Sequence, residues 1–166
     1  MVIHVNNYFK LIGNKLLLRT FTSQLSRFLN RNGYPVKIKT LKSKDLELDD
    51  FTFGAEYDCE LDEIGKKPIR VNFIINHPRI IPWAITKQSS QKLAIELTET
   101  LVHEIQHLHQ YRARNYRVPK HSYQGNEEVL YLSHPDEIDA YSMNIAVRWY
   151  INKNILNKVN YKKHVD

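Results

Sequence analysis

An unbroken helical run near the middle of the chain constrains the fold most. Residues from Ser89 to about Asn115 include neither glycine nor proline, so we expect one long helix there. Its apolar stripe covers about 80° of the helical wheel and consists of Leu97, Leu101, Ile105 and Leu108. His103 and His107 fall on the opposite side. This histidine pair is therefore exposed to solvent or turned into a cleft beneath another element.

The two histidines and Glu104 form the pattern HExxH, which is typical of zinc sites when it falls on a helix. Histidines four residues apart differ by about 40° around the axis, so both imidazoles can reach one tetrahedral metal ion with Glu104 beside it. A shuffled chain of this composition would contain the pattern in about two cases of a hundred. Two solvated histidines are the competing interpretation. The metal interpretation is favoured because Glu104 and a downstream residue both fit it.

A second helix is expected from Pro135 to about Ile151. The proline suits the first turn of a helix, and the acidic residues after it lie where the helix dipole favours negative charge. Glu137 falls early on this helix and shares a face with Ala140, Tyr141 and Asn144. The small alanine would let two helices approach closely. Two interpretations stay open here: Glu137 binds the metal, or it only complements the dipole.

Two strings of sequence resemble a known family. The first is HExxHxxQY, and the second, further along, is PxEIDAY. Together they resemble the small zincin-like metallopeptidases of phage and bacterial genomes and, more broadly, the gluzincins, whose third ligand is a glutamate on a later helix. The strings consist of His103, Glu104, His107, Gln110 and Tyr111, then Pro135, Glu137, Ile138, Asp139, Ala140 and Tyr141.

The resemblance covers residues from about Leu93 to Ala146. It implies that one zinc ion is bound by His103, His107 and Glu137, and that Glu104 is the catalytic base. Many gluzincins carry an aspartate four residues after the ligand glutamate, where this chain has Tyr141. The candidates for orienting the ligand histidines are therefore Asp139, Tyr141 and Asn144.

Other histidines provide competing ligand sets. A third ligand at His121 would resemble the SprT-like proteases, which act on proteins crosslinked to DNA. Glu137 is preferred because the residues around His121 lack the glycine and aromatic pattern associated with that family. His134 is a further alternative. His109 lies about 200° around the helix from His107, so packing or solvation is expected for it.

The first half of the chain predicts the rest of an α+β fold. Residues from about Tyr8 to Asn30 have helical periodicity, and strand patterns cover Val36 to Leu41, Phe51 to Leu61 and Ile69 to Asn76. A hairpin connection is expected at Gly65 to Pro68. We expect a minimal zincin-like domain with an N-terminal helix, a small, mostly antiparallel three-stranded sheet, the HExxH helix and a C-terminal helix carrying the third ligand. The strand from Ile69 to Asn76 is the expected edge for pairing with an extended substrate, or is only core.

Composition is consistent with one domain over residues 1–157, followed by a basic tail at 158–166. The chain has 166 residues, 42% of them hydrophobic, and five glycines. Its single cysteine, Cys59, excludes an intramolecular disulfide framework. No secretory signal or membrane span is expected, so the predicted location is the cytoplasm, including a host cytoplasm or a virion if the chain is phage-encoded.

The net charge of +6 suggests nucleic acid as a partner. The basic residues are spread along the chain, however, with small clusters at Lys37 to Lys44, Arg112 to Arg117 and Lys158 to Lys163. No nucleic-acid-binding motif accompanies them. A solvated basic surface is therefore the preferred interpretation, and the expected partner is a protein or peptide substrate.

The expected function is zinc-dependent endopeptidase activity. Zinc would acidify a water molecule, and Glu104 would accept its proton. The oxyanion donor is left open among Tyr111, His121, Tyr123, Tyr131 and Tyr141, and residues 118–132 are expected to form a lid or specificity loop. Two other functions remain open: a non-catalytic binding module for nucleic acid or a host protein, and a structural zinc site closed by a fourth ligand such as His121 or His134.

Overall fold

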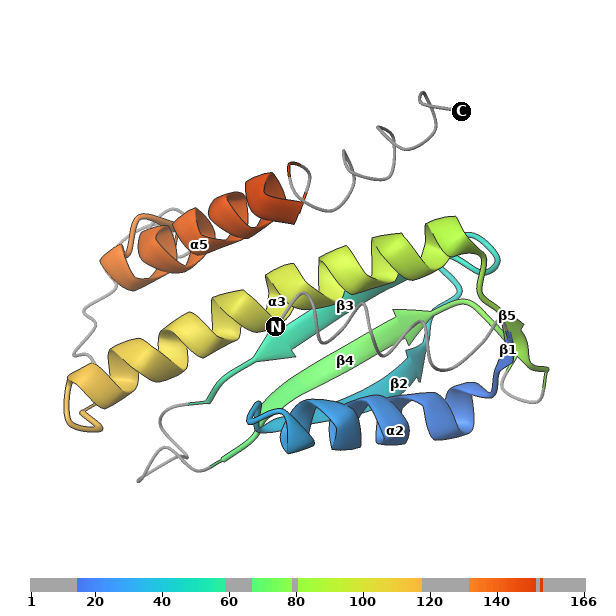
Figure 1. Ribbon diagram of the computed structural model, residues 1–166, viewed down its shortest axis with the longest axis horizontal. Helices are drawn as coiled ribbons and strands as arrows, with labels where there is room; N and C mark the ends of the chain where they lie inside the picture. The colour runs from blue at the N-terminus through green and yellow to red at the C-terminus, as the bar shows by residue number, and fades with distance from the viewer. Residues whose placement is uncertain (1–14, 59–66, 79–80, 118–131, 152, 154–166) are drawn as a thin grey trace, which may run out of the picture.

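The computed structural model describes residues 15–58, 67–78, 81–117, 132–151 and 153. Within them the chain forms three helices, a mixed three-stranded sheet and a two-stranded sheet, which together make an α+β arrangement (Figure 1). The expected fold class is therefore confirmed. Cys59 and the basic tail at 158–166 lie outside the described residues.

The first described helix, α2 (Leu18–Arg31), begins later than its periodicity predicts. Strand β1 (Lys15–Leu16) precedes it and pairs antiparallel with β5 (Trp83–Ala84). Leu17, between β1 and α2, has an extended backbone with φ −79° and ψ 118°. Pairing with a distant segment thus overrides the apolar periodicity at Lys15 and Leu16, and the expected helix at residues 8–14 lies outside the described part.

The three-stranded sheet is mixed rather than mostly antiparallel. Its order is β2 (Val36–Lys42), β4 (Ile69–Ile75), β3 (Phe51–Glu56). Strands β2 and β4 are parallel, whereas β3 and β4 are antiparallel. The antiparallel pairing of two consecutive strands agrees with the expected hairpin, although residues 59–66 of its connection are outside the described part.

The position of β4 corrects one expectation. The strand at Ile69–Ile75 is central, bonded on both sides, so it is not an edge available to a substrate. Its composition explains this position: Ile69, Val71, Phe73 and Ile75 are buried in alternation. Among the described strands of this sheet, β3 is the edge on the side of the HExxH helix (Figure 1).

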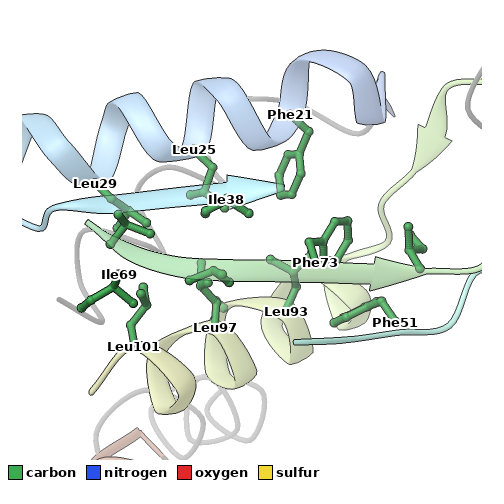
Figure 2. Packing of buried hydrophobic residues seen from close by; sticks show 14 of the residues in the cluster. Phe21, Leu25, Leu29, Ile38, Phe51, Ile69, Phe73, Leu93, Leu97 and Leu101 are labelled. Carbon is green, nitrogen blue, oxygen red and sulfur yellow. The ribbon is translucent and has the colours of Figure 1, made fainter. Parts of the chain in front are cut away.

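One face of the sheet carries the core. Figure 1 shows α2 lying over β2 and the long helix α3 (Lys87–Ala113) lying over β3. The side chains between these layers are fully or almost fully buried (Figure 2), and the labelled ones are Phe21, Leu25, Leu29, Ile38, Phe51, Ile69, Phe73, Leu93, Leu97 and Leu101. Burying each of these large side chains contributes about 1.5–3 kcal/mol. The apolar stripe of α3 is therefore what fixes this helix on the sheet.

The two helices of the HExxH and PxEIDAY strings form as expected. The hydroxyl oxygen of Thr86 accepts a hydrogen bond from the backbone N–H of Ser89 at 3.0 Å, which caps the start of α3. Helix α5 (Pro135–Ile151) has exactly the expected bounds and packs along α3, on the side away from the sheet (Figure 1). None of the described helices combines the length and apolar character needed to cross a bilayer.

Shortening Leu97 to alanine is expected to destabilise the fold by about 2–5 kcal/mol, because the side chain is fully buried and its loss leaves a cavity. Chemical denaturation would measure the change. Leu48→Ala is the matched control, since Leu48 is 72% exposed. An equal loss for the two variants would contradict the assignment of Leu97 to the core.

Candidate metal centre

Three side chains from two helices converge on one point. His103 and His107 lie on α3, and Glu137 lies on the first turn of α5. The Nε2 atoms of the histidines are 3.1 Å apart. Glu137 Oε2 is 3.3 Å from His103 Nε2, and Glu137 Oε1 is 3.2 Å from His107 Nε2. One ligand atom from each residue lies within 4.8 Å of the others, so these residues could hold a metal ion.

The spacing and the polarity of this group fit a bound cation. Metal–ligand distances of about 2.0–2.2 Å place the ligand atoms of a tetrahedral site about 3.3–3.6 Å apart. Glu137 is buried, and its Oε2 has no hydrogen bond of good geometry among the described residues although it lies near His103. A buried carboxylate is costly unless its charge is compensated. A divalent cation would compensate it and would use both histidine nitrogens.

Contacts between α3 and α5 hold Glu137 in place. Ala140, one turn later, is fully buried, which lets the helices approach closely as expected. Arg114, directly after α3, contacts Asp136 on α5, with 2.7 Å between Nη1 and Oδ2. At the other end of α5, Arg148 donates to Glu99 from Nε at 2.7 Å and from Nη2 at 2.8 Å. The dipole interpretation of Glu137 is therefore insufficient, since the side chain faces two histidines.

Glu104 stands apart from the three ligands. Its side chain is buried, and Oε2 accepts a hydrogen bond from the backbone N–H of Tyr57 at 2.6 Å. Tyr57 follows directly after β3. Burial raises the pKa of Glu104, while His107 and the Tyr57 N–H oppose that rise. The raised pKa of Glu104 lies closer to neutral pH, and a general base works best when its pKa is near the operating pH.

The histidines are oriented by different neighbours. Burial and the nearby His107 lower the pKa of His103, although Glu137 opposes this shift. The lowered pKa favours the neutral imidazole, which is the form that binds metals. The ring of Tyr141 lies edge-on to His103, with 4.8 Å between ring centroids. His107 Nδ1 is 3.0 Å from Gln110 Oε1. Gln110 was not among the candidates for this role, although its position three residues after His107 places both on one helix face.

The other residues expected to orient the histidines or to donate to an oxyanion have other surroundings. Asp139 Oδ2 accepts hydrogen bonds from Gln106 at 2.6 Å and from Gln110 at 3.1 Å, so its contact with His107 is indirect. Asn144 Oδ1 is buried and has no hydrogen-bond partner among the described residues. Tyr111 is a core residue whose ring packs against those of Tyr57 and Tyr116. Of the described oxyanion candidates, only Tyr141 has a ring in contact with a ligand histidine.

The remaining candidate residues are only partly described. His121 lies outside the described residues, so the ligand set that contains it stays a prediction. The oxyanion candidates Tyr123 and Tyr131 and most of the expected lid also lie outside them. His134 Nδ1 accepts a hydrogen bond from the backbone N–H of Asp136 at 3.2 Å, which makes it part of the start of α5. His109 is exposed on α3, as expected.

The basic clusters follow the local structure. Lys37 and Lys39 are exposed on β2, alternating with buried Val36 and Ile38, as a half-buried strand requires. Arg114 is paired with Asp136. Lys37 and Lys39 thus lie on the solvent side of a strand, Arg114 is in an ion pair, and residues 158–163 lie outside the described part.

Comparison of the chain with protein-family models, with curated proteins and with solved structures found no match.

The metal centre predicts the metal content of purified protein. Native chain prepared without a metal-affinity tag should bind about one divalent ion per chain. Glu137→Ala should lose that ion, because it removes one of three ligands, whereas His109→Ala should keep it. Elemental analysis measures both. Loss in His121→Ala with retention in Glu137→Ala would instead establish the ligand set containing His121.

The raised pKa of Glu104 predicts a pH-dependent stability difference in metal-free protein. Because the folded-state pKa is above the ordinary value of 4.5, the ionised group destabilises the fold at neutral pH. The cost disappears below about pH 4.5, where the group is protonated in both states. Glu104→Gln should therefore raise the denaturation midpoint at pH 7 in the presence of a chelator, and the gain should shrink towards pH 4. An unchanged or lower midpoint at pH 7 would contradict the burial argument.

Proposed function

We propose that the protein is a zinc-dependent metallopeptidase of gluzincin type, an endopeptidase acting on a protein or peptide substrate. One observation carries the proposal: His103, His107 and Glu137 converge, while Glu104 is buried beside them and is held by a backbone N–H instead of joining the ligand group. A purely structural site has no use for a second buried carboxylate held outside the ligand set.

The coordination number supports catalysis over a structural clamp. Structural zinc sites have four protein ligands, whereas catalytic ones keep one position for water. In the part of the chain that is described, the ligand group contains only three residues. His134, one candidate fourth ligand, accepts a hydrogen bond at the start of α5 through Nδ1. An open fourth position is the arrangement that the proposal requires.

The chemistry is then divided between the metal and the chain. A bound zinc ion supplies a Lewis acid and lowers the pKa of its water to about 7. Glu104 accepts the proton of the attacking water and passes it to the leaving amine. The Tyr57 N–H keeps one oxygen of Glu104 fixed during both transfers. Tyr141, beside His103, is the described residue best placed to donate a hydrogen bond to the developing oxyanion.

The sheet supports a peptide as the substrate. Strand β3 takes the edge role that was expected for β4, and it ends next to the residue that holds Glu104. An extended peptide pairing with β3 would have its backbone fixed close to the catalytic carboxylate. The partial exposure of β3 along Phe53 to Ala55 is compatible with such pairing.

The decisive experiment compares native protein with Glu104→Gln on denatured casein and on a quenched fluorescent peptide library. Glu104→Gln should lower kcat by about 100- to 10,000-fold, because it removes the general base. The bound zinc should remain, since Glu104 is not a ligand.

Two controls make the result specific. A chelator should abolish native activity, and added zinc should restore it. His109→Ala should behave like native protein. A zinc-loaded native protein without proteolytic activity, or activity unchanged in Glu104→Gln, would overturn the proposal and favour a binding module with a retained metal site.

A further inference from the structure

We propose that Gln110 is a positioning residue that orients His107 towards the metal and couples it to the turn carrying Glu137. This inference rests on the proposed metal site. It concerns a side chain that is neither a proposed ligand nor the proposed base. Gln110 makes one hydrogen bond to His107 within α3 and two to residues of α5.

The contacts of Gln110 fix the direction of its amide group. The Nε2 atom is 3.0 Å from the backbone carbonyl oxygen of Asp136 and 3.1 Å from Asp139 Oδ2. A carbonyl and a carboxylate only accept hydrogen bonds, so both must face the NH2 group. The amide oxygen is therefore the atom that faces His107.

The amide oxygen in turn selects the tautomer of His107. It lies 3.0 Å from Nδ1 and can only accept, so Nδ1 carries the proton. The lone pair is then on Nε2, the atom that faces Glu137 at 3.2 Å. Metal-binding histidines commonly depend on such a hydrogen bond from their second nitrogen. Without Gln110, either nitrogen of His107 could carry the proton and the ring could rotate.

The coupling to α5 is unequal between the two acceptors. The contact with the Asp136 carbonyl is partly buried, whereas the contact with Asp139 is exposed to water. Hydrogen bonds shielded from solvent contribute more. The Asp136 carbonyl is therefore the main anchor, and Asp139 is an auxiliary one. Since Asp136 and Asp139 flank Glu137, Gln110 ties the ring of one ligand to the helical turn of another.

The chain provides a matched control for testing this role. Gln106, one turn earlier on α3, also donates to Asp139 Oδ2, at 2.6 Å, and is also partly buried. This hydrogen bond of Gln106 does not involve either histidine of the metal centre. Gln106→Met and Gln110→Met thus remove the same kind of side chain from the same interface, and only the second removes the partner of His107.

The experiment measures zinc affinity by competition with a chromogenic chelator. Gln110→Met should weaken zinc binding by about 10- to 100-fold, as losses of such supporting hydrogen bonds do. Gln106→Met should weaken it by less than about threefold, because only the helix contact changes. Melting curves in excess chelator test whether both metal-free variants remain folded.

A spectroscopic readout separates positioning from general loosening of the interface. In zinc-loaded native protein, the Nδ1–H proton of His107 should give a protected NMR signal. Gln110→Met should lose that protection, and Gln106→Met should retain it.

The possible failures are distinguishable. Equal affinity losses in the two variants, or a protected Nδ1–H in Gln110→Met, would overturn the positioning role while leaving the metal site intact. Absence of zinc binding by the native protein would overturn the proposed function and this inference together.

Discussion

The burial of the Glu137 carboxylate against two histidine nitrogens is the constraint at the centre of the interface between α3 and α5. A carboxylate in that position must have its charge compensated, and the described neighbours offer only imidazoles. Peripheral ion pairs at Asp136 and Glu99 hold the two helices together at both ends, but they are partly exposed and screened by water. A cation held between the three side chains would compensate this charge at the centre of the interface.

Helix α3 joins this interface to the rest of the molecule. Its apolar side packs on the sheet through Leu93, Leu97 and Leu101, and its other side carries the histidines. Glu104 is the crossing point, because it is on the same helix but is bonded to the backbone just after β3. The sheet thus sets the position of the proposed base, while α5 supplies Glu137, the third candidate ligand.

Sequence periodicity predicted the HExxH helix and helix α5, whereas the grouping of Glu137 with the two histidines came from the family resemblance. The HExxH spacing is local, so its geometry follows from the helix alone, and the bounds of α5 follow from Pro135 and the residues after it. Pairings between distant segments were less accessible. The short strand at Lys15–Leu16 depends on Trp83–Ala84, and the central position of β4 depends on parallel pairing with β2. Neither leaves a signal in a local window of sequence.

The residues that orient the histidines were also only partly predictable. Asp139 was among the expected ones, but its link to His107 passes through Gln110. That link depends on the packing of α5 against α3, which no local stretch of sequence specifies. The bond from the Tyr57 backbone to Glu104 could not have been expected, because a backbone donor has no residue type to recognise.

The position of α5 on the outer side of α3 has a consequence for metal binding. Two ligands belong to a helix fixed by the core, and the third belongs to a helix whose extensive contacts are with α3 (Figure 1). The apparent affinity for a metal ion is the intrinsic affinity scaled by the fraction of molecules in which all three side chains are in place. That fraction is the fraction with α5 docked on α3. By the same linkage, the ion stabilises docking in return. For an ion held by these three residues, metal binding and helix docking would form one equilibrium, so a molecule that competes for the docking face of α5 would weaken metal binding without entering the site.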